Sequence, residues 1–594
     1  MAARRLDLDD LSSPHVLREY ALLADGERGI LVGPRGDFAW MCFPSWESEA
    51  LFAALIGGRG VYALTPRGRY VWGGYYEDGT LIWRSRWTTT DSIMECREAL
   101  VVPASRHRAV VLRRLIAVEG EARADVVLDG RAGFGQQPMT AVERVGDRVW
   151  TARTGTTYLR WSGADDVEVA ADGHGGRALA TTLDLEPGCH RDLVLEVGEH
   201  APDGAPEVPE RLWVSTEDWW AAARSATPAT DVAGRDVRHA YAVLRGMTST
   251  SGGMVAAATT SLPERAGEGR SYDYRYAWIR DQCLAGQAMA AAGPHPLVDG
   301  AAGFVTDRLL DDEWRLRPAY TVSGEHIPGE TALGLSGYPG GSDIVGNRVS
   351  GQFQLDTFGQ SLLLLAAAAR HDRLDARGWR AADVACSAIA RRWQEPDAGI
   401  WELEPAIWTE SRLTCVAGLR AIVAAGAPPS RARDWSCLAD VILDDTLADA
   451  VHPNGRWQRT PDDVRVDAAL LLPMIRGAVP PSDPHALATM MSVREELVQD
   501  GFVFRFAPDD RPLGEAEGAF VMCGYLMSLA CLRIGDHLSA ARFFECNRAA
   551  CGPPGLFTEE YDVGERQLRG NIPQAFAHGL MVECAVRQGA GGWS

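Results

Sequence analysis

The chain has 594 residues, of which 46% are hydrophobic and 23% charged, with a formal net charge of −21 and a pI near 5.1. This length predicts two or more globular units, because single domains usually span about 100–200 residues. The acidic balance and the lack of a long basic run argue against a nucleic-acid partner, since a phosphate backbone needs concentrated basic side chains.

Targeting and cofactor signals are sparse. No stretch of about 18 uninterrupted apolar residues occurs, and the N-terminus turns acidic where a signal peptide would need an apolar run. We therefore expect a cytoplasmic protein with no membrane partner. The twelve cysteines are scattered without a Cys-x-x-Cys pair, which favours buried thiols over disulfides or zinc. We expect no metal or other cofactor; a homo-oligomer stays open.

The N-terminal third carries short apolar alternations broken by Gly and Asp turns, as at 109–118 and 122–128. Runs of period two separated by tight turns predict antiparallel strands in a sandwich. Residues 198–209 lose this periodicity and are rich in Pro, Gly and acidic residues. We therefore assign 1–200 to a β-sandwich domain and 201–235 to a linker with a helix near 213–226.

Beyond residue 235 the apolar residues take helical spacing. The clearest segments are 356–370, 378–393, 412–425, 485–499 and 519–534. Such helices, joined by long Gly/Pro/Asp-rich loops, predict a helical toroid over 236–594. The lack of a Gly-x-Gly-x-x-Gly after a strand, of a phosphate loop and of a short repeat argues against a nucleotide enzyme or a solenoid.

The segment richest in chemistry is Ser271-Tyr-Asp-Tyr-Arg-Tyr-Ala-Trp-Ile-Arg-Asp281. Aromatic rings can cover the apolar face of a sugar, while Arg and Asp can form charge-assisted hydrogen bonds to its hydroxyls. A structural Arg–Asp pair beneath an aromatic cluster would leave the same pattern. Composition alone keeps both interpretations open.

Two later segments place glutamates in loops that precede helices. In Gly399-Ile-Trp-Glu402 the neighbouring Trp401 could desolvate the carboxyl and keep it protonated as a general acid. In Thr558-Glu-Glu-Tyr-Asp562, Glu559 or Glu560 could serve as a base. A lone surface glutamate and a solvated acidic loop are the commoner explanations of such residues.

Taken in order, these motifs and the later Gly570-Asn-Ile-Pro-Gln-Ala-Phe-Ala-His578 resemble the bacterial glucoamylase/trehalase-like branch of glycoside hydrolase family 15. Further matching segments lie at 19–55, 257–264, 353–356, 467–473 and 517–520, so the likeness covers nearly the whole chain. The resemblance implies a multidomain β + α protein, with an N-terminal antiparallel β-sandwich followed by an (α/α)6 toroid.

The resemblance also implies roles for single residues. Glu402 would be the general acid and Glu559 the general base of an inverting reaction, with Arg280 and Asp281 holding the terminal glucosyl unit. Tyr274, Trp278 and Trp401 would line that pocket, Glu325 would contact the second sugar, and His578 would contact substrate or be a satisfied helix histidine. Inverting carboxyls stand about 6.5–9.5 Å apart, because a water must fit beneath the sugar. We expect Asp281 to matter more for binding than the loop carboxylate Asp273.

The match is poorest in Gly334-Leu-Ser-Gly-Tyr-Pro-Gly-Gly-Ser-Asp-Ile-Val-Gly-Asn347. Compared with bacterial relatives, Ser336 replaces a Glu, and Pro339 and Ile344 replace two arginines. The resemblance places these charges near the leaving sugar, so we expect an altered +1 subsite.

Two functions therefore stay open. The first is exo-acting, inverting hydrolysis of a short neutral α-glucoside, such as trehalose, isomaltose or a malto-oligosaccharide, with release of β-glucose. The alternative is a non-hydrolytic descendant that binds a sugar or acts in specialised metabolism. The retained glutamates favour the first, and the lost charges favour the second.

Overall fold

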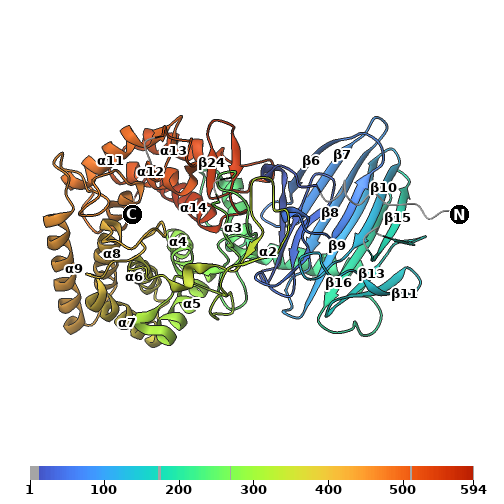
Figure 1. Cartoon of the computed structure of the whole chain (residues 1–594), viewed down its shortest axis with the longest axis horizontal. Coiled ribbons are helices and arrows are strands. Elements are labelled where there is room, and N and C mark those ends of the chain that lie inside the picture. Colours follow the sequence, from blue (N-terminus) through green and yellow to red (C-terminus); the bar gives the residue numbers. More distant parts are fainter. Residues whose placement is uncertain (1–12, 172–174, 268, 509–510, 593–594) are drawn as a thin grey trace.

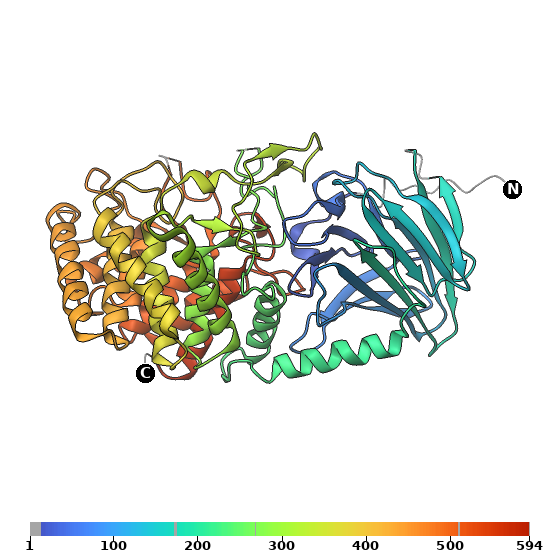
Figure 2. The same cartoon turned by 90° about the horizontal axis from the view of Figure 1, so that it is seen from below.

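The computed structural model describes residues 13–171, 175–267, 269–508 and 511–592. A β-rich N-terminal part and a helical C-terminal part lie against each other along the long axis of the molecule (Figure 1). Helix α2 (Pro209–Arg224) connects them along one side (Figure 2).

The β part is built from antiparallel sheets. Its eight-stranded sheet runs β11 (Thr140–Gly146), β12 (Val149–Thr154), β13 (Thr157–Ser162), β16 (His190–Gly198), β9 (Arg108–Glu119), β8 (Ile93–Leu100), β7 (Trp83–Thr88) and β6 (Val71–Tyr76). A four-stranded sheet with the order β14 (Glu168–Ala171), β15 (Arg177–Leu185), β10 (Ala122–Asp129) and β5 (Val61–Pro66) shares its core. The burial of β7 alternates strictly along most of the strand, as one core face predicts.

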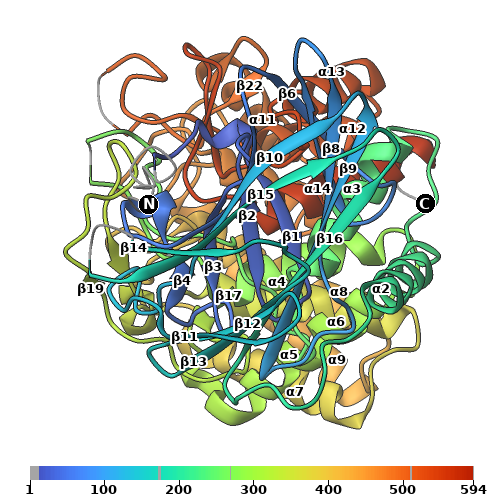
Figure 3. The same cartoon turned by 90° about the vertical axis from the view of Figure 1, so that its right-hand side faces the viewer.

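A second four-stranded sheet joins the β part to the helical part. It consists of β1 (Ala21–Ala24), β2 (Gly29–Val32), β3 (Phe38–Cys42) and β4 (Ala50–Phe52). Leu23 packs in the core of the sandwich, whereas its neighbour Leu22 packs in the core of the helical part. Both faces are therefore buried, and Figure 3 shows the strands crossing in front of the helices.

The helical part is a double ring. Its inner helices are α4 (Ile279–Ala290), α6 (Asp356–Arg370), α8 (Thr409–Ala424), α10 (Leu472–Arg476), α12 (Val521–Arg533) and α14 (Ala575–Gly589), each packed against the next, with α14 closing on α4. The outer helices are α3 (Gly234–Gly246), α5 (Pro296–Asp312), α7 (Ala376–Arg392), α9 (Pro429–Asp449), α11 (Pro484–Glu496) and α13 (His537–Arg548). This is the (α/α)6 toroid that the resemblance implied.

The sequence explains which helices are inside. In α6 and α12 nearly every residue is buried, as expected of a helix that is apolar all round. In α7 the buried residues recur along one face, and the opposite face is polar. The expected segments coincide with α6, α7, α8, α11 and α12 to within a few residues, except that α11 ends at Glu496 and a short strand, β21 (Val498–Gln499), follows. Among the described residues no helix is long and apolar enough to span a bilayer.

Candidate active site

A cavity of about 1160 Å³ opens at the N-terminal ends of the inner helices. Its lining includes Trp278, Arg280 and Asp281 at the start of α4, and Trp408 just before α8. The described lining also includes Glu264, Arg270, Tyr272, Tyr274, Arg348, Gln352, Trp401, Glu402, Glu404, Arg459, Asp463, Arg465, Arg505, Glu517, Phe520, Glu559 and Gln574. Loops before helices thus bring distant parts of the chain into one hollow, as the spacing of loops and helices implied.

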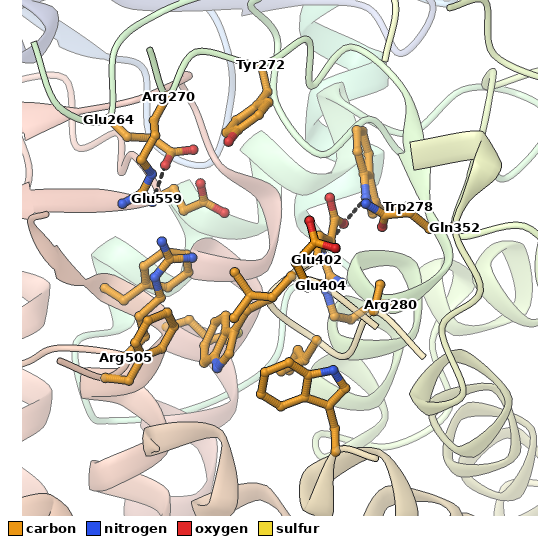
Figure 4. A pocket seen from close by; sticks show the side chains of 18 of the residues that line it. Glu264, Arg270, Tyr272, Trp278, Arg280, Gln352, Glu402, Glu404, Arg505 and Glu559 are labelled. Carbon is orange, nitrogen blue, oxygen red and sulfur yellow. Dashed lines mark hydrogen bonds and ion pairs between the residues drawn. The ribbon is translucent and has the colours of Figure 1, made fainter. Parts of the chain in front are cut away.

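Glu402 lies on one wall of this cavity (Figure 4). Its Oε1 accepts hydrogen bonds from the Trp278 indole at 2.7 Å and from Arg280 Nη2 at 3.3 Å, and its side chain keeps 25% exposure. The indole in contact with this carboxyl therefore belongs to Trp278, because the N–H of Trp401 donates to Asp467 instead. One oxygen is held by two donors, and the group stays accessible from the cavity.

The backbone around Glu402 is unusual. Glu402 has φ of +57°, a conformation that costs a residue with a Cβ free energy. Gly399 has φ of +66°, and a Cβ there would lie 2.8 Å from the Trp408 ring. Beneath the loop, Asp397 Oδ1 accepts from the Gly399 amide at 2.7 Å and from the Ser411 hydroxyl at 3.0 Å. A buried carboxyl and a glycine therefore fix the loop that carries Glu402.

Arg280 and Asp281 form the deep end of the same wall. Asp281 is 1% exposed, and its Oδ2 has no hydrogen-bond partner among the described residues. Arg280 Nε lies 3.6 Å from that oxygen. Burial raises the pKa of Asp281 to about 6, although Arg280 opposes the shift. An acceptor without a donor at the floor of a cavity is suited to a ligand hydroxyl.

Glu559 lies on the opposite wall (Figure 4). It directly precedes β24 (Glu560–Asp562) and is 7% exposed. Its Oε2 lies 2.9 Å from the Tyr274 hydroxyl oxygen, within hydrogen-bond distance. Burial, with the charges of Glu264 and Glu560, raises the pKa of Glu559 well above its usual range. The two glutamates singled out from the sequence thus share one cavity but have different surroundings.

A cluster of charges surrounds Glu559. Arg270 bridges three carboxylates: it binds Glu264, Glu560 at 2.9 Å and Glu517 at 2.8 Å. Arg505 binds Glu517 as well, at 2.8 Å. Burial raises the pKa of Glu560 to about 8 against the influence of Arg270. Four carboxyls with two guanidinium groups leave this wall acidic.

Two expected substrate contacts lie elsewhere. Glu325 is exposed and outside the cavity lining, in a turn where its backbone N–H donates to the Thr321 hydroxyl. His578 is fully buried in α14, packs on the Phe557 ring and accepts from the Phe557 amide at 3.4 Å. Burial lowers the pKa of His578 well below its usual range. His578 is therefore a neutral core residue beneath the Glu559 loop.

Most of the segment that departs from the family pattern lies outside the cavity lining, and only its last residue, Asn347, belongs to that lining. Ser336, Pro339 and Ile344 are absent from its lining. A Cβ on Gly57 would lie 1.9 Å from Ser336 Oγ, and the Gly337 amide donates to the Ile56 carbonyl. Ser336 therefore packs against the β part, whereas the Ile344 carbonyl accepts from the Thr260 and Ser261 hydroxyls. That these three positions reshape the +1 subsite stays a prediction.

Asp273 has different partners from Asp281. This loop carboxylate is fully buried and forms a bidentate ion pair with Arg275, with distances of 2.8 and 2.7 Å. It also accepts from the Gly346 amide. The motif at 271–281 therefore contains both arrangements that composition left open, a structural Arg–Asp pair and an Arg–Asp pair that faces the cavity.

Several lining residues carried no signal in the sequence. Glu264 is the last residue of a segment that matched the family, yet nothing in that segment predicted that its side chain lines the cavity. Arg505 lies in the apolar run Phe502–Phe506, and Arg270 in a glycine-rich loop. Only the folded chain brings them to Glu559, so spacing along the sequence could not have found them.

One group of side chains outside the cavity has the spacing of metal ligands: His190, Asp192 and Glu210. However, Arg114 donates to both Asp192 and Glu210, and the Trp213 indole also donates to Asp192. The carboxylates already have cationic and neutral donors, which makes this a structural ion-pair network.

Comparison with known proteins agrees with this geometry. The family model for glycosyl hydrolases family 15 matches residues 237–586. The chain belongs to that family. A second model, for a trehalase-like N-terminal domain, matches residues 3–216. The chain is thus a glycoside hydrolase of the glucoamylase/trehalase type.

Individual relatives extend over both parts of the chain. A trehalase of Mycobacterium tuberculosis is 28% identical, covering 96% of this chain and 89% of its own length. A trehalase of Thermoplasma acidophilum is 25% identical, with coverages of 94% and 98%. The solved structure of a bacterial glucoamylase complexed with acarbose superimposes with a TM-score of 0.72 at 14% identity, covering 98% of this chain and 96% of that one, so it supports the fold alone.

Proposed function

We propose that this chain is an exo-acting, inverting hydrolase that releases β-glucose from a short, neutral α-glucoside, with trehalose as the first candidate. One observation carries the proposal: Glu402 and Glu559 face a single cavity from opposite walls, and Asp281, which has an oxygen without a partner among the described residues, lines the same cavity. The relatives named trehalase, which match nearly the whole chain, support the choice of substrate.

In this mechanism the glucosyl unit lies at the floor, where Asp281 accepts from its hydroxyls and Arg280 donates to them. Tyr274, Trp278 and Trp401 offer aromatic surface around the ring. Glu402 gives a proton to the leaving oxygen as the glycosidic bond breaks. Glu559 takes a proton from the water that attacks the anomeric carbon on the other face, so configuration inverts.

The alternative of a non-hydrolytic descendant loses its support. It rested on the charges missing at Ser336, Pro339 and Ile344, and these residues pack outside the cavity lining. Arg348, Glu404 and Arg465 supply polar groups around the leaving sugar in their place.

The test is a panel of trehalose, isomaltose, maltose, panose and soluble starch with glucose release as the readout, followed by early-time NMR of the anomer. We expect a disaccharide to exceed starch and the first product to be β-glucose. Initial release of α-glucose would refute inversion, and faster release from starch than from every disaccharide would refute the size preference. Binding of a sugar without release from any substrate would refute hydrolysis.

A further inference from the structure

Tyr274 lies between two carboxyl groups. Its hydroxyl oxygen is 2.9 Å from Glu559 Oε2 and 3.2 Å from Glu264 Oε1. A phenol hydroxyl has one proton, so it can donate to one of these carboxyls and must accept from the other. Both contacts are hydrogen bonds only when Glu264 or Glu559 is protonated. Two simultaneous hydrogen bonds at Tyr274 would therefore require one carboxyl proton among the three groups.

The backbone builds this arrangement. Glu264 is 3% exposed, and its amide donates to the Arg270 carbonyl at 3.0 Å. Gly570 donates to the Pro263 carbonyl at 2.8 Å and has φ of +83°. A Cβ on Gly570 would lie 3.4 Å from Glu264 Cγ and 3.9 Å from Glu559 Cβ. Gly570 therefore lies between the two glutamate side chains, and its lack of a side chain lets them approach each other.

The charges around the pair are unequal. Arg270 forms an ion pair with Glu264, whereas the Glu559 carboxyl contacts the neutral Tyr274 hydroxyl. Ionised Glu264 is thus stabilised directly, and burial among carboxylates favours a proton on Glu559. Among the described residues, the charged or titratable groups that interact with Glu264 or Glu559 are Arg270, Tyr272, Tyr274, Arg505, Cys523 and Glu560. Glu402 acts on Tyr274, and Glu517 binds Arg270.

Building on the proposed role of Glu559 as base, we propose that Glu264 is a positioning residue that shares one proton with Glu559 through the Tyr274 hydroxyl. At rest Glu559 holds the proton and donates to Tyr274, which donates to Glu264. For catalysis the proton of Glu559 moves to the Tyr274 oxygen, and the proton of Tyr274 moves to Glu264. The charge of the trio is unchanged, and Glu559 becomes the anion that accepts a proton from water.

The first test is the pH profile of kcat/KM for Glu264→Gln, with Glu517→Gln as the matched control. Glutamine keeps an acceptor for Arg270 and donates permanently to Tyr274, so Glu559 ionises without a competitor. We expect the acidic limb to move to lower pH by about one unit, a tenfold change in proton affinity. Glu517→Gln removes the same charge from the same arginine without touching Tyr274, and its limb should move far less. Equal shifts, or no shift in Glu264→Gln, would overturn the proposal.

The second test removes the connection. In a Tyr274→Phe background, Glu264→Gln should move the limb less than it does in the native enzyme, because no hydroxyl then links the carboxyls. Tyr274→Phe is itself expected to be slow, so the readout is the position of the limb and not the rate. A shift of the same size in both backgrounds would mean that charge acts through space, and it would refute sharing through Tyr274.

A third measurement needs no substrate. Infrared spectroscopy of the protonated-carboxyl C=O stretch, followed against pH, should show in the native protein a carboxyl that stays protonated above the usual range of glutamate. In difference spectra against the native protein, Glu264→Gln should lose one protonated carboxyl at high pH and Glu517→Gln should keep it. The carboxyls of Glu560 and Asp397, which also hold their protons above the usual range, are present in both variants. Identical titrations of native protein and Glu264→Gln would overturn the sharing. Failure of α-glucoside hydrolysis alone would leave this result intact and refute only the proposed function.

Discussion

The two walls of the cavity give their carboxyls opposite surroundings, both in exposure and in neighbouring charge. Glu402 keeps a quarter of its side chain exposed and is held by a neutral indole and one guanidinium. Glu559 is nearly buried and lies among three other carboxyls, with two guanidinium groups that bind those neighbours. As the proton donor, Glu402 needs access to the leaving oxygen. As the base, Glu559 must be ionised, so the proton that its surroundings favour has to move to another group.

The two walls also differ in how far apart in the sequence their residues lie. The loop of Glu402 has a local hydrogen bond from Gly399 to Asp397, two residues away, and few ion pairs, although Trp278 and Arg280 hold the Glu402 carboxyl from a distant part of the sequence. The wall of Glu559 is assembled from segments around 264, 270, 505, 517 and 559, which are distant in sequence. We expect damage to the first wall to stay local and damage to the second to spread through its ion pairs.

The largest expected effect separates the two carboxyls by chemistry. Glu402→Gln and Glu559→Gln should each lower kcat on the natural substrate by about 10²–10⁴, the usual contribution of general acid–base catalysis. With α-glucosyl fluoride, whose leaving group needs little protonation, Glu402→Gln should recover much of its rate and Glu559→Gln should not. Unchanged melting temperatures would confirm folding, and recovery of both variants would contradict the assignment of roles.

The next effect compares the two aspartates of the 271–281 motif. Asp281→Asn should lower kcat/KM strongly with little loss of stability, because Asp281 lines the cavity and one of its oxygens has no hydrogen-bond partner among the described residues. Asp273→Asn should instead destabilise the fold by about 3–5 kcal/mol, since it breaks a buried pair and leaves Arg275 without a counter-charge. Urea unfolding and steady-state kinetics on both variants check this. Equal losses of stability would contradict the distinction.

A smaller effect concerns pH and the buried carboxyl beneath Glu402. Burial, with the charge of Asp356, raises the pKa of Asp397 to about 8. The folded chain therefore keeps a proton that the unfolded chain releases near its usual pKa of about 4, and this contribution to stability is full below pH 4 and lost as pH rises to 8. Asp397→Asn cannot ionise. Between pH 8 and pH 5 the native protein should gain about 3–4 kcal/mol relative to this variant. A pH-independent difference would contradict the raised pKa.

The sequence predicted the fold well because its signals were local. Period-two runs mark β9 and β10, and helical spacing marks α6 to the residue. The motifs also placed Glu402, Glu559, Arg280 and Asp281 around one cavity. Arg270 and Arg505 could not be found in this way, because the carboxylates that they bind lie more than ten residues away in the sequence. Asp273 and Asp281 differ only in what the fold packs around them, which composition does not record.

The smallest effect defines where the site ends. Glu325→Ala should change kcat/KM by no more than about twofold, because exposed residues without buried contacts usually change free energies by less than 0.5 kcal/mol. Glu404→Ala is the matched comparison, since Glu404 is also an exposed loop glutamate but lines the cavity. Loss of one hydrogen bond to the leaving sugar there should raise KM by about two- to tenfold while leaving kcat nearly unchanged. If Glu325→Ala instead raised KM more than Glu404→Ala, the second sugar would lie over the turn at 321–325. The substrate site on the side of Glu402 would then extend beyond the cavity lining.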